Sequence, residues 1–81
     1  MSETKEMTEI SANYFLSRLA ERVSAYNARL LLSSAMVESG IYESISDAPM
    51  AKEDAKTLCL KLIKKGGPAF HVGQSIYREV Q

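Results

Sequence analysis

Cysteine and histidine are the side chains best suited to catalysis or metal binding, and this 81-residue chain has one of each. They cannot form a cluster of His and Cys metal ligands, and a nucleophile with its base would require Cys59 and His71 to meet. Cys59 falls on the apolar stripe of an expected helix, which favours a small buried residue over a reactive thiol. His71 lies at the start of the next helix, where a surface histidine is the simpler interpretation. We therefore expect no enzymatic activity, no metal and no cofactor.

Two further motifs have a structural explanation. Gly66 and Gly67 lack the flanking residues of a phosphate-binding loop, so they are better read as the end of a helix. Glu53 and Asp54 lie in a helix's first turn, where the helix dipole favours acidic side chains.

The composition is that of a folded soluble protein, with 46% hydrophobic and 25% charged residues. Ten basic and ten acidic residues give a net charge of zero. This balance argues against nucleic acid as the partner, because neutralising phosphates requires an excess of Lys and Arg. No apolar run approaches the length of a signal peptide core or a membrane span, and a single cysteine fits a reducing compartment. We expect a cytoplasmic protein without a membrane partner.

The charge is unevenly distributed. Residues 1–50 contain four basic and seven acidic residues, a net −3, whereas residues 51–81 contain six basic and three acidic residues, a net +3. Such a dipolar chain suits head-to-tail assembly. A surface on which solvated charges of both signs are mixed would give the same net charges for the two parts of the chain, so both interpretations stay open.

Apolar residues recur at helical spacing along most of the chain, and no segment alternates as a half-buried strand does. The pattern predicts a flexible lead-in over 1–8 and one domain over 9–81, with helices at 9–25, 28–39, 41–46, 51–65 and 68–80. The second of these helices would begin at an N-cap, Asn27, and carry Leu30, Leu31, Ser34, Val37 and Ile41 on one face. The fold class is then all-α, a compact antiparallel bundle of five helices or six. The predicted core comprises Phe15, Leu19, Val37, Leu58, Leu62, Phe70 and Ile76.

The corner between the last two helices carries a family resemblance. A helix beginning Glu53-Asp54-Ala55-Lys56-Thr57-Leu58 ends in Lys64-Lys65-Gly66-Gly67-Pro68-Ala69-Phe70, and the final helix closes with Tyr77-Arg78-Glu79-Val80. Upstream, 30–40 followed by 41–46 is similar to a second helix and a short third one. Over residues 10–80 the chain resembles a caspase recruitment domain of the death-fold superfamily. This resemblance implies a Greek-key arrangement of the helices.

The resemblance also implies a function. Such domains bind one another to recruit or activate tethered effectors, such as proteases, in cell-death or innate-immune signalling. The implied contact sets basic residues of the first and fourth helices against acidic residues of the second and third. Candidate basic residues here are Arg18, Arg22, Lys56, Lys61 and Lys64. Candidate acidic residues are Glu38, Glu43 and Asp47. Because the two patches differ, the contact would be heterologous and could propagate.

Leu60 is a separate candidate for a partner contact. On a helical wheel it falls with Glu53 and Lys64, away from the apolar stripe. It would anchor a partner or be one of the scattered exposed leucines that are normal on protein surfaces. The alternative for the whole chain is a small dimeric helical regulator or inhibitor, of phage or bacterial type, unrelated to death folds.

Overall fold

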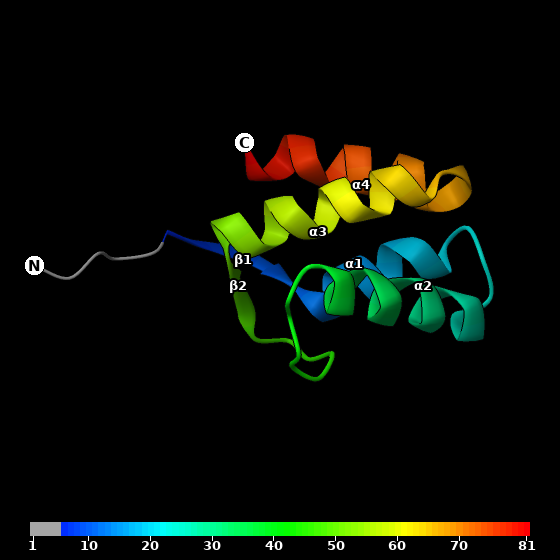
Figure 1. Ribbon diagram of the computed structural model, residues 1–81, viewed down its shortest axis with the longest axis horizontal. Coiled ribbons are helices and arrows are strands. Elements are labelled where there is room, and N and C mark those ends of the chain that lie inside the picture. The colour runs from blue at the N-terminus through cyan, green and yellow to red at the C-terminus, as the bar shows by residue number, and fades with distance from the viewer. Residues whose placement is uncertain (1–5) are drawn as a thin grey trace, which may run out of the picture.

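The computed structural model describes residues 6–81 and consists of two successive strand-helix-helix units (Figure 1). The first unit contains β1 (Met7–Ser11), α1 (Ala12–Ala20) and α2 (Ala25–Glu38). The second contains β2 (Pro49–Ala51), α3 (Lys52–Lys65) and α4 (Gly67–Val80). The α3–α4 hairpin stacks on the α1–α2 hairpin, and the strands lie at one end of the stack (Figure 1). The described chain thus has four helices and a two-stranded sheet, so the prediction of an all-α, Greek-key bundle of five or six helices is wrong.

The two strands pair antiparallel, with Met7 opposite Ala51. Thr8 Oγ1 strengthens the pairing by donating a hydrogen bond to the carbonyl oxygen of Met50, at 3.1 Å. The residue pattern predicts no strand, and this prediction is wrong for the described residues, which contain β1 and β2. Of the predicted lead-in over 1–8, residues 1–5 lie outside the described part of the chain, and Met7 and Thr8 belong to β1.

Serine caps define where α1 and α2 begin. Ser11 Oγ accepts a hydrogen bond from the Tyr14 amide at 3.1 Å, and Ser24 Oγ accepts one from the Asn27 amide at 3.2 Å. Ser11 itself is extended, with φ −116° and ψ 168°, so the residues before it continue into a strand. The predicted starts at residue 9 and at an Asn27 cap are therefore wrong, because serine oxygens satisfy the first free amides of these helices at other positions.

Residues 41–46 form a loop where the sequence predicted a short helix. Gly40 has a positive φ of 78° and ends α2, and the Ile41 amide then donates to the carbonyl oxygen of Met36 at 2.8 Å. The carbonyl oxygen of Ser46 accepts from the Asn13 amide at 3.0 Å. Ile41 enters the core by itself, and the backbone of Ser46 makes its hydrogen bond to α1, so this segment is an irregular loop rather than a helix.

The corner between α3 and α4 has the predicted form. Gly66 and Gly67 have φ of 78° and 60°, values that favour glycine, and Pro68 lies in the first turn of α4. The predicted helix over 51–65 is confirmed to within one residue, and the predicted helix over 68–80 likewise.

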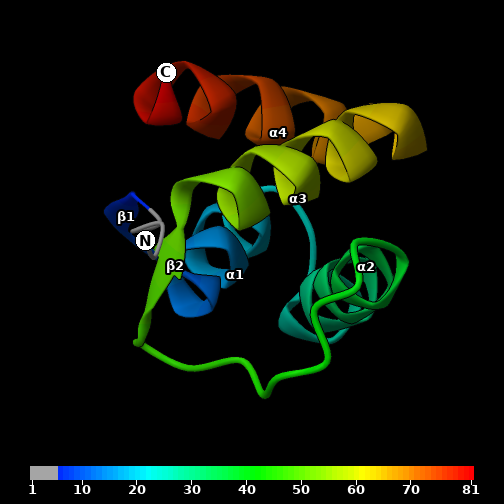
Figure 2. The same ribbon diagram turned by 60° about the vertical axis from the view of Figure 1, so that its left-hand side comes forward.

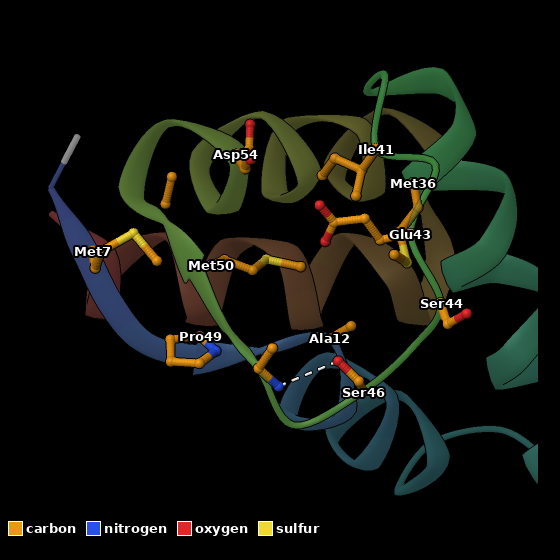
Figure 3. A pocket seen from close by; sticks show the side chains of 12 residues that line it. Met7, Ala12, Met36, Ile41, Glu43, Ser44, Ser46, Pro49, Met50 and Asp54 are labelled. Atoms are coloured by element: carbon orange, nitrogen blue, oxygen red, sulfur yellow. Dashed lines mark hydrogen bonds between the residues drawn. The ribbon is translucent and has the colours of Figure 1, made fainter. Parts of the chain in front are cut away.

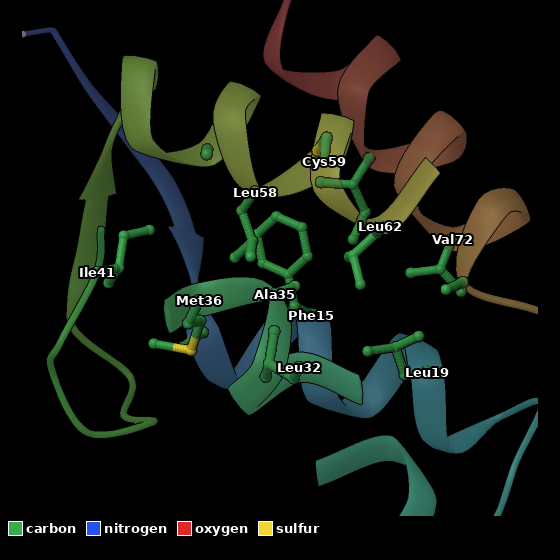
Figure 4. Close-up of a cluster of buried hydrophobic side chains, with 14 of the residues drawn as sticks. Phe15, Leu19, Leu32, Ala35, Met36, Ile41, Leu58, Cys59, Leu62 and Val72 are labelled. Carbon is green, nitrogen blue, oxygen red and sulfur yellow. The ribbon is translucent and has the colours of Figure 1, made fainter. Parts of the chain in front are cut away.

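All four helices contribute to one core (Figure 4). Its largest fully buried side chains include Phe15, Leu19, Leu32, Leu58, Leu62 and Ile76. Five of the seven predicted core residues are confirmed. Phe70 is only half-buried. The prediction that Val37 belongs to the core is wrong, because Val37 is 57% exposed. α2 presents a different side to the core from the one that the sequence indicated.

Candidate interaction surface

α2 carries large apolar side chains on the side that faces away from the core. Tyr26, Leu30 and Val37 are 72%, 52% and 57% exposed. Their spacing of four and seven residues places them on one line along the helix, here termed the α2 stripe. Tyr42, just beyond the end of α2, is 80% exposed.

The opposite side of α2 is also apolar, and it is buried. The buried side chains on this inner side are Ala28, Leu32, Ala35 and Met36. α2 has only two charged residues, Arg29 and Glu38. A helix with apolar residues on two sides is normally covered on both. Figure 2 shows α2 at the periphery, with the other helices on its inner side. The α2 stripe is thus a row of exposed apolar side chains, interrupted by Ser33 and Ser34, and exposed apolar residues grouped in this way mark interaction sites.

A shallow open hollow of about 470 Å³ runs beside the α2 stripe, between α2 and the loop over 41–45. It is termed the α2 groove here. Its apolar lining is Met36, Val37, Ile41, Tyr42 and Ile45. The remaining lining residues are polar or charged, and they include Arg29 and Glu43. A second hollow of about 370 Å³, between α1 and α2, also borders Arg29.

Arg29 and Glu43 are both exposed, and neither has an ion pair or side-chain hydrogen bond within residues 6–81. Arg29 lies in the second turn of α2, whereas Glu43 lies in the loop that follows this helix. The α2 groove therefore has a positive side chain toward one end, a negative side chain toward the other and apolar side chains between them.

The predicted basic residues differ in how free they are to contact another molecule. Arg18 makes an intramolecular cluster between α1 and α4, in which its Nη1 lies 3.1 Å from Glu79 Oε2 and its Nη2 donates to Ser75 Oγ at 2.9 Å. Arg22 is exposed in the turn after α1. The three predicted lysines belong to α3, where Lys64 is exposed and Lys56 and Lys61 are half-buried. One of the five basic candidates is thus already paired.

The predicted acidic residues are also divided. Glu38 Oε2 lies 3.4 Å from Lys65 Nζ, an ion pair that joins α2 to α3. Asp47 Oδ1 accepts a hydrogen bond from Asn13 Nδ2 at 2.9 Å. Only Glu43 has neither kind of side-chain partner in the described part of the chain, so it is the acidic candidate most available to another molecule.

The Arg18 cluster has a third member, Tyr14. Its hydroxyl donates to the Glu79 carboxylate at 2.8 Å and accepts from Arg18 Nη1 at 2.9 Å. The hydrogen bond to Glu79 is the main cause of a raised Tyr14 pKa, and burial adds to it, while Arg18 acts in the opposite direction. These contacts hold α1 against α4.

Leu60 points outward, as predicted, and is 48% exposed. It lies on α3 and lines neither the α2 groove nor the hollow between α1 and α2. Leu60 is therefore a separate apolar surface residue, and whether it anchors a partner stays a prediction.

Cys59 is fully buried, as predicted. Burial raises the pKa of its thiol to about 12, and the charge of Glu79 adds to the shift. Such a thiol stays protonated at neutral pH and is shielded from solvent, so it is unsuited to nucleophilic attack. His71 is exposed and contacts the ring of its neighbour Phe70 edge-on.

A third hollow, of about 200 Å³, lies beneath the loop that connects α2 to β2 (Figure 3). Methionines line much of it, namely Met7, Met36 and Met50. Glu43 and Asp54 add carboxylates, and Ser46 Oγ accepts from the Ala48 amide at 3.2 Å. No group of three or more His, Cys, Asp or Glu residues in 6–81 is placed to hold a metal ion. Glu43 lines both this hollow and the α2 groove.

Sequence reasoning missed the α2 stripe because it assigned Leu30, Ser34 and Val37 to the core face. The structure leaves all three exposed. A usable signal was present in the sequence: the window over 25–38 carries apolar residues on more than one side, which leaves some of them to be covered by something other than the core.

No helix in residues 6–81 combines the length and apolar character needed to cross a bilayer. No protein-family model, curated protein or solved structure matched this chain.

Proposed function

We propose that this protein is a non-enzymatic, homotypic interaction module that associates through the outer side of α2. One observation carries the proposal: an apolar stripe lies exposed on a helix whose other side is already in the core. Covering such a surface removes apolar area from water at roughly 25 cal/mol per Å². Association is the simplest way for the molecule to gain this energy.

The size of the surface supports the proposal. The α2 stripe and Tyr42 together expose on the order of 600 Å², against roughly 800 Å² per partner in a standard interface. Neighbouring groove residues would supply the remainder. Tyrosine is also enriched among residues that dominate binding energy.

A non-enzymatic role is supported by the candidate nucleophile. Cys59 is buried with a raised pKa, and His71 is exposed on α4. The hollows bring together methionines, carboxylates and serines rather than a nucleophile with its base.

Assembly through charged patches is a second candidate. The separation of Lys56, Lys61 and Lys64 on α3 from Glu43 and Asp47 in the loop favours it, because unlike patches can join head to tail. Recruitment of an effector in cell-death or immune signalling stays a prediction that rests on the resemblance to caspase recruitment domains. The small dimeric regulator also stays open.

Sedimentation velocity over a range of protein concentrations tests the proposal. Val37→Asp should weaken association at least about tenfold, because it places a charge in the contact. Leu60→Asp is the matched control, since Leu60 is similarly exposed but lies on α3. A wild-type protein that stays monomeric up to about 1 mM would contradict the proposal. So would loss of association in Leu60→Asp with Val37→Asp unaffected.

A further inference from the structure

The α2 groove is self-complementary in charge. Arg29 borders it near the N-terminal part of α2, and Glu43 borders it in the loop beyond the C-terminal end. Arg29 and Glu38, the last residue of the helix, are nine positions apart, which corresponds to about 13 Å along its axis. A partner that fits this groove must carry a negative group at the first end and a positive group at the second.

A second copy of the chain satisfies this requirement when it is turned by 180°. Rotation about an axis that lies just outside α2, perpendicular to the helix and level with Ser33, reverses the groove, so Arg29 of each copy approaches Glu43 of the other. Because both residues border the same side of α2, the rotation keeps them on one side of the contact. We infer that this protein forms a closed two-fold dimer, with antiparallel α2 helices and two reciprocal Arg29–Glu43 ion pairs. The inference rests on the proposed function and specifies its partner and geometry.

The apolar residues of the α2 stripe fit the same axis. Leu30 precedes Ser33 by three residues and Val37 follows it by four, so each would lie across from the other in the partner copy. Ser33 and Ser34, at the centre, are small and exposed and permit the helices to approach closely. Both sides of the contact thus carry matching side chains, as an isologous interface requires.

Charge elsewhere does not oppose this dimer. The molecule is neutral overall, so two copies do not repel each other. Glu38, the other charged residue of α2, is already paired with Lys65. Glu43 borders two hollows, and a change of side-chain rotamer, which is common at interfaces, directs its carboxylate toward the partner.

Charge reversal followed by mixing tests this geometry directly. Arg29→Glu alone and Glu43→Arg alone should each weaken dimerisation about tenfold or more, because each sets like charges together twice. Mixing the two variants should restore a heterodimer to within about threefold of the wild-type Kd, since one pair is then the native Arg29–Glu43 contact and the other is the same contact with its charges exchanged. Arg22→Glu, an exposed arginine outside the groove, is the control. Sedimentation velocity with one variant fluorescently labelled separates homodimers from heterodimers.

The outcomes distinguish the geometry from the proposed function. If the single variants dissociate and the mixture recovers, the two-fold pairing is supported. If Val37→Asp dissociates the protein but either reversal has no effect, or the mixture does not recover, the pairing is overturned while the interaction module stands. If the wild type never associates, both are overturned. Circular dichroism and thermal melts verify that each variant is folded, which is expected because neither residue has an internal side-chain partner in residues 6–81.

Discussion

Gly73 of α4 packs directly against the backbone of Cys59 on α3. A Cβ atom at position 73 would lie 2.7 Å from the Cys59 carbonyl oxygen and 3.0 Å from Leu62 Cβ. Backbone cannot yield as a flexible side chain does, so only glycine allows the two helices to approach this closely.

Gly73→Ala should therefore destabilise the protein, although alanine favours helices more than glycine does. We expect the overlap with α3 to outweigh the propensity gain and to lower the free energy of unfolding by about 1–3 kcal/mol. Urea unfolding measures the change. Gln74→Ala, at an exposed neighbouring position, should stay within about 0.5 kcal/mol of the wild type. A Gly73→Ala protein as stable as this control would contradict the expected close packing.

The buried thiol of Cys59 makes stability depend on alkaline pH. Its pKa is about 12 in the folded chain, against an ordinary value of 9.0. Between these values the unfolded chain has lost the proton that the folded chain keeps. Stability contributed by the neutral thiol is thus fully present below about pH 9 and is lost as pH rises toward 12, by at most about 1.4 kcal/mol per pH unit.

Comparison with Cys59→Ala isolates this effect. The variant should be less stable at pH 7, because it leaves a small cavity, but its stability should fall less steeply between pH 9 and 11. Contributions from every group that the two proteins share cancel in the difference. Parallel curves of unfolding free energy against pH would show that the thiol pKa is not raised.

The Tyr14–Arg18–Glu79 cluster predicts a linked change in ionisation and stability. Glu79→Gln removes the carboxylate whose hydrogen bond is the main cause of the raised Tyr14 pKa. The Tyr14 pKa should fall toward its ordinary 10.0, as measured by an NMR titration of its ring protons. Stability near neutral pH should decrease by about 1 kcal/mol, because the pair is partly exposed. A Tyr14 pKa that does not move would argue against the cluster.

The loss of stability on replacing Gly66 should depend on backbone conformation and not on contacts of the new side chain. No atom lies within 4 Å of a Cβ built there, but φ is 78°. Gly66→Ala and Gly66→Asn should each cost about 1–3 kcal/mol in stability, because φ of 78° with ψ of −177° lies in a region that essentially only glycine adopts, and asparagine tolerates positive φ in the left-handed helical region instead. A Gly66→Ala protein as stable as the wild type in thermal or urea unfolding would contradict this backbone conformation.

The sequence predicted the second helical hairpin well because its signals are local. Glu53 and Asp54 begin α3, Lys64 and Lys65 end it, and glycine follows at once. β1 was missed because it has only five residues and β2 only three, which is too short for a clear alternation of apolar and polar residues. The two strands also lie far apart along the chain. A strand this short depends on its partner more than on its own composition.

The interaction surface was harder to predict than the fold. Arg18 is equally basic whether free or paired, and only the structure places Glu79 beside it, 61 positions along the chain. Val37 is equally apolar on either face of α2, so its orientation depends on which neighbours fill the core. The charged candidates could thus be named from the sequence, but their availability could not.

The strand pair also determines the order in which the chain can fold. Each helical hairpin closes through contacts between near neighbours, whereas Thr8 and Met50 meet across 42 positions. The pairing of β1 with β2 bears a larger loop-closure entropy than the closure of either hairpin, as do the contacts of Arg18 with Glu79 across 61 positions. These long-range contacts therefore belong later on the folding route than the hairpins, and the strand pair opens early on unfolding. Amide hydrogens of the strand pair should consequently exchange faster than those of α3, and the two hairpins would separate at this junction before either one melts.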